Sequence, residues 1–204
     1  MKLSIKDVSK FYTHGAHDVF HVKRVYYNAL ELAKTLKCDI EVVKASALLH
    51  DVARFLEDEK NVCHAQEGAK MAEKILKKYD YSPLQVSNII HCIKVHRYSK
   101  DMKPETVEAK ILQDADRLDT LGAITIGRVF HYAGGHNEPM HDPKIKPHKT
   151  YKKYGPPKTA INHFFEKILK IQPKTFQTKK ARDIAQKKYK FTTDFIKKFL
   201  NEWK

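Results

Sequence analysis

The stretch ALLHDVARFL, residues 47–56, places a histidine and an aspartate side by side within a run of helix-forming and apolar residues. On a helix, His50 and Asp51 point about 100° apart, so both side chains can border one buried cleft. Buried polar groups cost free energy unless a partner satisfies them. The fold must therefore bring partners to His50 and Asp51 from other segments.

The rest of the chain has a helical pattern as well. Apolar residues recur every three or four positions, whereas alternating runs bounded by turn residues are scarce. This periodicity predicts an all-α fold. Asp39 and the pair Ser82-Pro83 are typical of helix starts. We expect helices over about residues 18–36, 39–56, 62–79, 83–96, 104–130, 159–171 and 178–203.

Residues 134–157 interrupt this pattern, because they hold five of the eight prolines and three of the seven glycines. The histidines, lysines and tyrosines of this segment make it a candidate flap over an anionic ligand, with residues 144–153 closing on polyphosphate; a surface loop is the alternative. We expect a single domain over residues 1–204, with a helical core at 15–133, the loop at 134–157 and C-terminal helices at 158–204.

Composition restricts the class of protein. The 204 residues, 42% of them hydrophobic, fit one globular domain. No run approaches the roughly 18 apolar residues of a membrane span, and the N-terminus lacks the apolar core of a secretion signal, so we expect a cytoplasmic protein with no membrane partner. Cys38, Cys63 and Cys92 form no C-x-x-C pair, and we expect reduced thiols. The formal charge of +15 favours anionic partners, and a solvated lysine-rich surface is the alternative.

Polar residues interrupt the apolar stripes of two further predicted helices. His21 shares its stripe with Val25, and Asp114, Asp116 and Asp119 lie within KILQDADRLDTLGA. Singly, each has an ordinary explanation, such as a hydrogen-bonded core histidine or a capping aspartate. Together with the His-Asp pair, imidazoles and carboxylates from three helices would all be satisfied by one divalent cation.

The order His21, His50-Asp51, Asp116 resembles the H…HD…D signature of the HD-domain metal-dependent phosphohydrolases, which are all-helical enzymes. The longer stretches HDVFHVKRVYYNA, ALLHDVARF, KILQDADRLDTLGAITIGRVFHYAGG and INHFFEKILKI are similar to a small stand-alone subgroup regarded as nucleotide phosphohydrolases or pyrophosphohydrolases. The resemblance spans about residues 15–203. It implies that the metal ligands are His21, His50, Asp51 and Asp116, the last because the ligand aspartate of the family is directly followed by Arg or Lys.

A site of imidazoles and carboxylates without thiolate suits Mn²⁺, Mg²⁺, Co²⁺, Ni²⁺ or Fe²⁺. We expect one such ion. In relatives with two metals, further histidines occupy the third and fourth helices, where this chain has His64 and His96. The adjacent paired histidines of those relatives are absent, because His91 and His96 are separated, and this counts against a second metal.

A phosphate substrate also needs positive partners. Arg24, one turn from His21, and Arg54, one turn from His50, offer planar donor forks to phosphate; surface salt bridges are the alternative. Arg117 can instead pair with Asp114 or Asp119. The candidate substrate contacts are Arg24, Arg54, Lys94, Asp114 and Arg117.

The candidate catalytic residues are Asp51, Arg24, His64 and His96. The two histidines have reference pKa values near neutrality and can relay protons if they do not bind metal.

These features predict a metal-dependent phosphohydrolase that acts on nucleotides. The resemblance, rather than any spacing, implies cleavage of a nucleoside triphosphate to the monophosphate and pyrophosphate. A 5′-nucleotidase or phosphodiesterase on the same site is one alternative, and a non-enzymatic nucleotide- or nucleic-acid-binding protein is another. Nucleic-acid binding is not expected, because the lysines are spread along the chain and no segment resembles a recognition helix with interleaved aromatic residues. The sequence leaves the oligomeric state open, a homodimer included.

Overall fold

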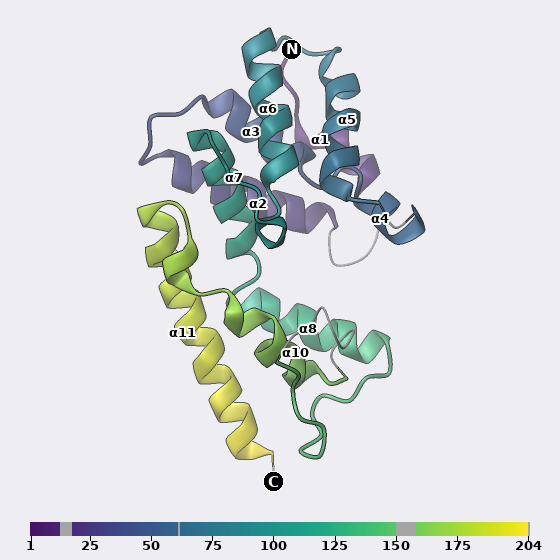
Figure 1. Ribbon diagram of the computed structural model, residues 1–204, viewed down its shortest axis with the longest axis vertical. Helices are drawn as coiled ribbons and strands as arrows, with labels where there is room; N and C mark the ends of the chain where they lie inside the picture. The colour runs from purple at the N-terminus through teal and green to yellow at the C-terminus, as the bar shows by residue number, and fades with distance from the viewer. Residues whose placement is uncertain (13–17, 61, 150–157, 204) are drawn as a thin grey trace. The chain divides into compact units, whose positions relative to one another are not determined.

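The computed structural model describes residues 1–12, 18–60, 62–149 and 158–203. Its regular structure is helical, and no strand occurs within these residues, so the predicted all-α fold is confirmed (Figure 1). The chain divides into two compact units, Met1–Arg117 and Leu118–Lys204. The single domain expected from the sequence stays a prediction.

The first unit is built around one almost fully buried helix. Seven of the ten residues of α3 are buried, a property of helices that are packed on all sides. Helix α3 packs against α2 and α6, and α5 packs against α6. In chain order the elements are α1 Ile5–Val8, η1 Ser9–Phe11, α2 Val19–Ala33, α3 Ile40–Leu49, α4 Arg54–Lys60, α5 His64–Leu76, α6 Pro83–Val95, η2 Tyr98–Lys100 and α7 Val107–Leu118.

Side-chain caps fix the starts of α3 and α6 where the sequence predicted them. The Asp39 carboxylate accepts the backbone N–H groups of Glu41 and Val42. The Ser82 hydroxyl accepts the N–H of Gln85, whose side chain accepts the N–H of Ser82 in return. Both caps satisfy N–H groups that a helix start leaves without intrahelical partners.

The predicted helix over residues 39–56 is wrong in one respect, because the chain turns at residues 50–53 between α3 and α4. The Arg54 N–H donates to the Asp51 carbonyl in this turn, and Val52 and Ala53 are fully buried. The stretch contains neither glycine nor proline, so the break follows from packing and not from a local breaker. His50 and Asp51 therefore lie in a buried turn at the end of α3 instead of on the side of a longer helix.

The predicted helix over residues 104–130 is also two helices. Helix α7 ends at Leu118, and α8, Ala123–Gly135, begins after Gly122. Gly122 has a φ of 87°, and a Cβ at this position would lie 3.3 Å from Cγ of Lys188. Only glycine adopts this left-handed backbone without strain, so Gly122 allows the chain to turn between the two helices.

The second unit packs α8 against α10, Ala160–Glu166, and against α11, Lys179–Glu202. The Phe130 ring of α8 contacts the rings of Phe164, Phe195 and Phe199. The helix predicted over 159–171 is shorter than expected, since a 3₁₀ turn at Ile168–Lys170 follows α10; a second 3₁₀ turn spans Pro173–Thr175. The C-terminal helix begins after its Thr178 cap, as the sequence predicted.

The segment between α8 and α10 contains no helix as far as residue 149. Asn162 donates to the carbonyl of Ile145, and the N–H of His148 donates to the Glu166 carboxylate, so two α10 side chains bind this segment. The remainder of the predicted flap, residues 150–157, lies outside the described residues, and the flap stays a prediction. Within the described chain, no helix is both long and apolar enough to cross a membrane.

Candidate metal centre

Asp51 lies at the centre of four histidines. Its Oδ2 atom is 3.6 Å from Nε2 of His21 and 3.5 Å from Nε2 of His50. Its Oδ1 atom is 3.1 Å from Nε2 of His64 and 3.5 Å from Nε2 of His96. All five side chains are buried. The fold thus brings together, around one carboxylate, the His-Asp pair and three histidines that are distant in sequence.

Each of these histidines lies at the end of a helix. His21 is in the first turn of α2, where its N–H donates to the Asp18 cap. His64 is the first residue of α5. His50 and His96 are the C-caps of α3 and α6. Backbone groups at helix ends lack intrahelical partners, so they are available to fix side chains.

Two backbone carbonyls orient the C-cap histidines. Nδ1 of His50 is 2.9 Å from the Ala47 carbonyl oxygen, and Nδ1 of His96 is 2.7 Å from that of Ile93. Because a carbonyl oxygen only accepts hydrogen bonds, both Nδ1 atoms carry a proton. In a neutral ring, Nε2 then presents its lone pair to Asp51, which is the form in which imidazole binds metal.

The environment shifts the pKa values of His50 and His96 in opposite directions. Burial lowers the pKa of His50 to about 4, so this imidazole is neutral at pH 7. Burial also lowers the pKa of His96, but the hydrogen bond and the charge of Asp51 outweigh that effect and raise it overall. His96 therefore holds a proton more tightly than His50 when no cation competes for it.

The donor set fits a divalent cation. Nε2 of His64 and Nε2 of His96 are 3.3 Å apart, and the same distance separates Nε2 of His21 and Nε2 of His50. The Nε2 atoms of His50 and His96 are acceptors when these rings are neutral, and they face the Asp51 oxygens, which are also acceptors. Protons or a cation must lie among so many acceptors, because buried acceptors without a donor are costly. Imidazole nitrogen and carboxylate oxygen suit the divalent ions expected from the sequence.

The three aspartates near the end of α7 have different surroundings. Asp116 Oδ1 is 3.5 Å from Nε2 of His21, so the predicted fourth ligand lies beside the cluster. Its side chain is 23% exposed and leaves room for solvent. Asp114 is fully buried. The Asp119 carboxylate in the second unit pairs with Arg128 at 3.0 Å, so it is already used in that unit.

Glu57 and Arg97 extend the cluster, and sequence reasoning missed both. The Glu57 carboxylate contacts Nδ1 of His64 and Nη1 of Arg54, and it lies 2.9 Å from Nη1 of Arg97. Glu57 belongs to the polar run EDEK, which looks like a solvated helix end. Its spacing from the His-Asp pair did not predict that it lies near the cluster, because the break before α4 changes the direction in which its side chain points.

The other predicted substrate contacts are less closely tied to the cluster. Arg24 is half-buried on α2, three residues after His21. Arg117 is buried, and its guanidinium carbon lies 3.7 Å from the centre of the Tyr98 ring. The substrate roles of Arg24, Arg54, Asp114 and Arg117 stay predictions.

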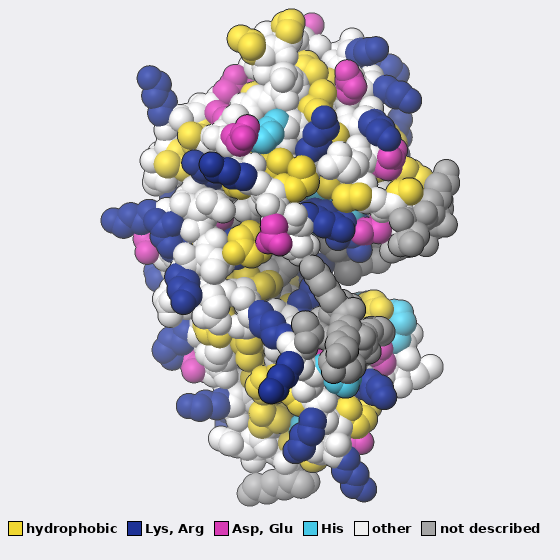
Figure 2. Space-filling view, in the orientation of Figure 1, with side chains coloured by type: hydrophobic (Ala, Val, Ile, Leu, Met, Phe, Trp, Pro, Cys, Tyr) yellow, Lys and Arg dark blue, Asp and Glu magenta, His cyan; other side chains and the backbone are white. Residues whose placement is uncertain are grey.

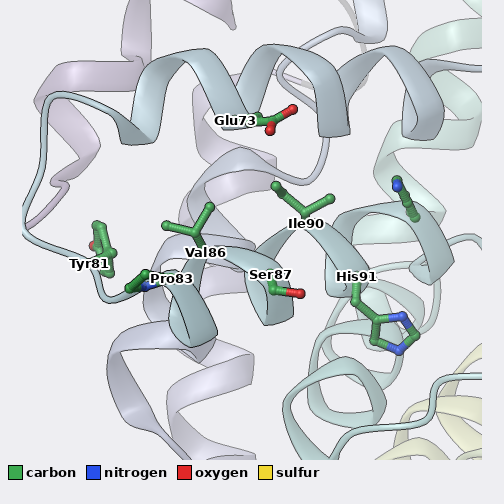
Figure 3. A pocket seen from close by; sticks show the side chains of 8 residues that line it. Glu73, Tyr81, Pro83, Val86, Ser87, Ile90 and His91 are labelled. Carbon is green, nitrogen blue, oxygen red and sulfur yellow. The ribbon is translucent and has the colours of Figure 1, made fainter.

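Lys94 lies elsewhere. It is exposed and lines a cavity of about 590 Å³ together with Tyr81, Val86 and His91 (Figure 3). None of the residues around Asp51 lines that cavity. The substrate-binding role expected for Lys94 stays a prediction.

The positive charge of the chain is not concentrated around the cluster. The unit that contains Asp51 has 20 Lys and Arg against 17 Asp and Glu, whereas residues 118–204 have 19 against 7. On the face seen in Figure 2, Lys and Arg side chains are spread and do not form one patch. The net charge of +15 therefore does not by itself mark the metal centre.

The metal-free protein is expected to lose stability as the pH falls from about 6.5 towards 4. Burial lowers the pKa values of His50 and His163 from 6.5 to about 4, so below pH 6.5 the unfolded chain binds more protons at these groups. Each of these two histidines lowers the free energy of unfolding by about 2 kcal/mol at pH 5 relative to pH 7. The raised pKa of His96 has the opposite sign: its contribution is present below pH 6.5 and is lost as the pH rises through the folded-state pKa.

Urea unfolding in EDTA at pH 5 and at pH 7 measures this effect. The variant His163→Asn lies in the second unit, outside the cluster, and should reduce the pH 5 to pH 7 difference by roughly half of the sum for the two lowered histidines. An unfolding free energy that stays constant or increases towards pH 5 would contradict the assignment of neutral buried imidazoles.

Known proteins that are similar to this chain include enzymes of a family with a His-Asp motif. The HD domain family matches residues 19–121 of the chain. A predicted HD superfamily hydrolase from an uncultured Thermotogales bacterium is 32% identical in an alignment that covers 98% of this chain and 91% of that protein, with a TM-score of 0.70. The chain belongs to the HD domain family. It is a metal-dependent phosphohydrolase of the HD type, and the groups around Asp51 are suited to hold its metal.

Two further relatives differ in how much of their length the chain matches. YpgQ of Bacillus subtilis is 29% identical over 187 residues, 90% of this chain and 82% of YpgQ. The crystal structure of YpgQ in complex with ADP has a TM-score of 0.72 at 27% identity and covers 97% of this chain and 92% of that one. Ribonuclease Y of Syntrophomonas wolfei subsp. wolfei is 32% identical over 106 residues, but the chain covers only 19% of its length.

Proposed function

We propose that this HD protein hydrolyses phosphate bonds of nucleotides at a centre of two divalent cations that share Asp51. The observation that carries the proposal is the position of the two Asp51 oxygens. Oδ2 faces His21 and His50, and Oδ1 faces His64 and His96. The ligand atoms within each of these groups all lie within 4.8 Å of one another. Asp116 completes the first group through its position beside His21.

This proposal departs from the single ion expected from the sequence. That expectation rested on the absence of an adjacent pair of histidines, since His91 and His96 are separated in sequence. In the structure, His96 reaches Asp51 from the end of α6 and His64 from the start of α5, so no adjacent pair is needed. His91 instead accepts the N–H of Glu105 and lines the separate cavity.

Divalent cations bound there would supply Lewis acidity, which lowers the pKa of a coordinated water and neutralises charge that develops on the phosphate. The residues of this chain have three tasks. The backbone carbonyls of Ala47 and Ile93 hold the C-cap imidazoles in the ligating tautomer. Burial keeps His50 neutral, so no proton occupies its Nε2. The guanidinium of Arg54 lies next to His64 and that of Arg97 contacts Glu57, and both can bind phosphate oxygens.

A nucleotide is the proposed substrate because YpgQ, which is similar over most of the chain, binds ADP in its crystal structure. Cleavage of a triphosphate to the monophosphate and pyrophosphate is the proposed reaction, and it rests on the resemblance to stand-alone nucleotide pyrophosphohydrolases. The proposed location is the cytoplasm.

A panel of nucleoside mono-, di- and triphosphates and cyclic nucleotides, each with Mn²⁺, Mg²⁺, Co²⁺ or Ni²⁺, tests the function. We expect triphosphates to release pyrophosphate and the monophosphate, as chromatography of the products shows. Phosphate release from monophosphates would identify a 5′-nucleotidase instead, and turnover of cyclic nucleotides alone a phosphodiesterase. Binding without turnover under every metal would support a non-enzymatic nucleotide-binding protein.

A further inference from the structure

The carboxylate of Glu57 joins one proposed metal ligand to two arginines. It contacts Nδ1 of His64 and Nη1 of Arg54, and its Oε1 lies 2.9 Å from Nη1 of Arg97. We infer that Glu57 is a positioning residue, which holds the His64 ring on Asp51 and fixes both guanidinium groups beside the metal centre. This inference rests on the proposed function, since it takes His64 as a ligand of the second cation.

The contact with His64 determines which nitrogen faces the metal. An ionised carboxylate only accepts hydrogen bonds, so it places the proton of a neutral His64 ring on Nδ1 and leaves Nε2 to face Asp51 at 3.1 Å. Nη1 of Arg54 also lies 3.0 Å from this Nδ1, but it contacts the same carboxylate and donates its hydrogen bond there. A carboxylate in this position also makes the ring a stronger base and therefore a stronger ligand. Glu57 thus does for His64 what a backbone carbonyl does for His50 and His96.

The Glu57 carboxylate makes these contacts in a partly shielded position. Its side chain is only 24% exposed, so water screens these interactions less than it does on an open surface.

An ordinary surface ion pair would look different. Arg54 and Glu57 are three residues apart on α4, and such a pair alone contributes less than about 1 kcal/mol. Glu57 also reaches Arg97, which is 40 residues away in sequence, and His64, which begins α5. One carboxylate therefore connects α4, α5 and the segment that follows α6. Arg97 comes directly after His96, so its position is linked to the same centre.

The arginines gain from the same contact. Two guanidinium groups share one carboxylate, so the three side chains keep a net charge of +1 beside the metal ligands, with donors left over for an anion. A guanidinium that is already fixed loses less conformational freedom when it binds phosphate. Removal of Glu57 should therefore weaken the binding of a phosphate compound as well as that of the cation.

The test uses the full chain and the variants Glu57→Ala and Glu57→Gln. Glu67→Gln is the matched control, because Glu67 also pairs with a cation three residues away, Lys70 at 2.7 Å, and its side chain is 31% exposed, close to that of Glu57. Calorimetric titration of each metal-free protein with Mn²⁺ gives the number of sites and their affinities. Thermal unfolding of the metal-free proteins, followed by circular dichroism, shows whether a variant is merely less stable.

We expect two Mn²⁺ sites in the natural chain and, in Glu57→Ala, a loss of about 10- to 100-fold in affinity at one of them. Glu57→Gln should lose less, since its amide oxygen still accepts the His64 proton. Inorganic pyrophosphate should bind the manganese-loaded Glu57→Ala protein more weakly than the natural chain. Glu67→Gln should change none of these values by more than about twofold.

Two outcomes would overturn the inference. Unchanged affinity at both sites of Glu57→Ala would show that His64 does not depend on Glu57. Equal losses at both sites, together with a lower unfolding temperature of the metal-free protein, would show a general structural role. A natural chain that binds no Mn²⁺ is a different result, because it removes the proposed metal centre itself and with it the proposed function.

Discussion

Asp51→Asn is expected to reduce phosphohydrolase turnover to background and to abolish tight metal binding. Asparagine has nearly the same shape, but it replaces one carboxylate oxygen with an amide that donates hydrogen bonds and carries no charge. Both histidine groups of the centre use Asp51, His21 and His50 through Oδ2 and His64 and His96 through Oδ1. The substitution therefore disables both groups at once, which the loss of a single histidine does not.

The loss of metal affinity should exceed the roughly 100-fold that removal of a residue behind a ligand costs, because Asp51 is itself a proposed ligand. Atomic emission of the purified protein and product assays in excess Mn²⁺ measure the two effects. Asp101→Asn is a suitable control, since Asp101 is exposed and has a φ of 54°, a backbone conformation that asparagine tolerates. An Asp51→Asn protein that keeps both its metal and its turnover would disprove the shared centre.

Removal of the metal is expected to stop turnover and to lower the unfolding temperature by roughly 5 to 10 °C. A ligand that binds only the folded chain stabilises it by about 2.7 kcal/mol when its concentration is 100 times the dissociation constant. For a chain of this size, each kcal/mol corresponds to about 2–4 °C. Turnover should return when Mn²⁺ is added in excess of the chelator.

Scanning calorimetry with EDTA and with Mn²⁺ measures the shift in unfolding temperature, and product assays on the same samples measure turnover. The Asp51→Asn protein is the control, because its unfolding temperature should hardly differ between the two conditions. If EDTA changed neither the turnover nor the unfolding temperature of the natural chain, metal-dependent hydrolysis at this centre would be refuted.

The sequence located most helices well, because apolar periodicity and capping residues act over a few positions. Asp39, Ser82 and Thr178 cap helices in the structure where the pattern had predicted helix starts. Three predicted helices, over residues 39–56, 104–130 and 159–171, ended at the wrong positions. Gly122 offered a signal for the break before α8. The turn after α3 offered none, because the burial of Val52 and Ala53 depends on contacts between segments that are distant in sequence.

For the site as well, the sequence predicted the residues of a local motif and missed residues that are brought close only by the fold. The H…HD…D resemblance pointed to His21, His50, Asp51 and Asp116, and the polar atoms of these residues lie close together in the structure. The sequence predicted one ion because adjacent paired histidines are absent, whereas the second cation that we propose would use histidines on different helices. Glu57 and Arg97 stayed hidden because charged residues in a polar run usually face solvent. Only the direction of α4 after the turn brings Glu57 to His64.

The position of the donors at helix ends has a consequence for motion. Each donor lies within about one turn of an end of α2, α3, α5, α6 or α7, and the donors are His21, His50, Asp51, His64, His96 and Asp116. Helix ends fray more readily than helix centres, and local opening there needs little free energy. Two bound cations that share Asp51 would together link these five helix ends. Their release would loosen the ends while the buried centre of α3 remained closed.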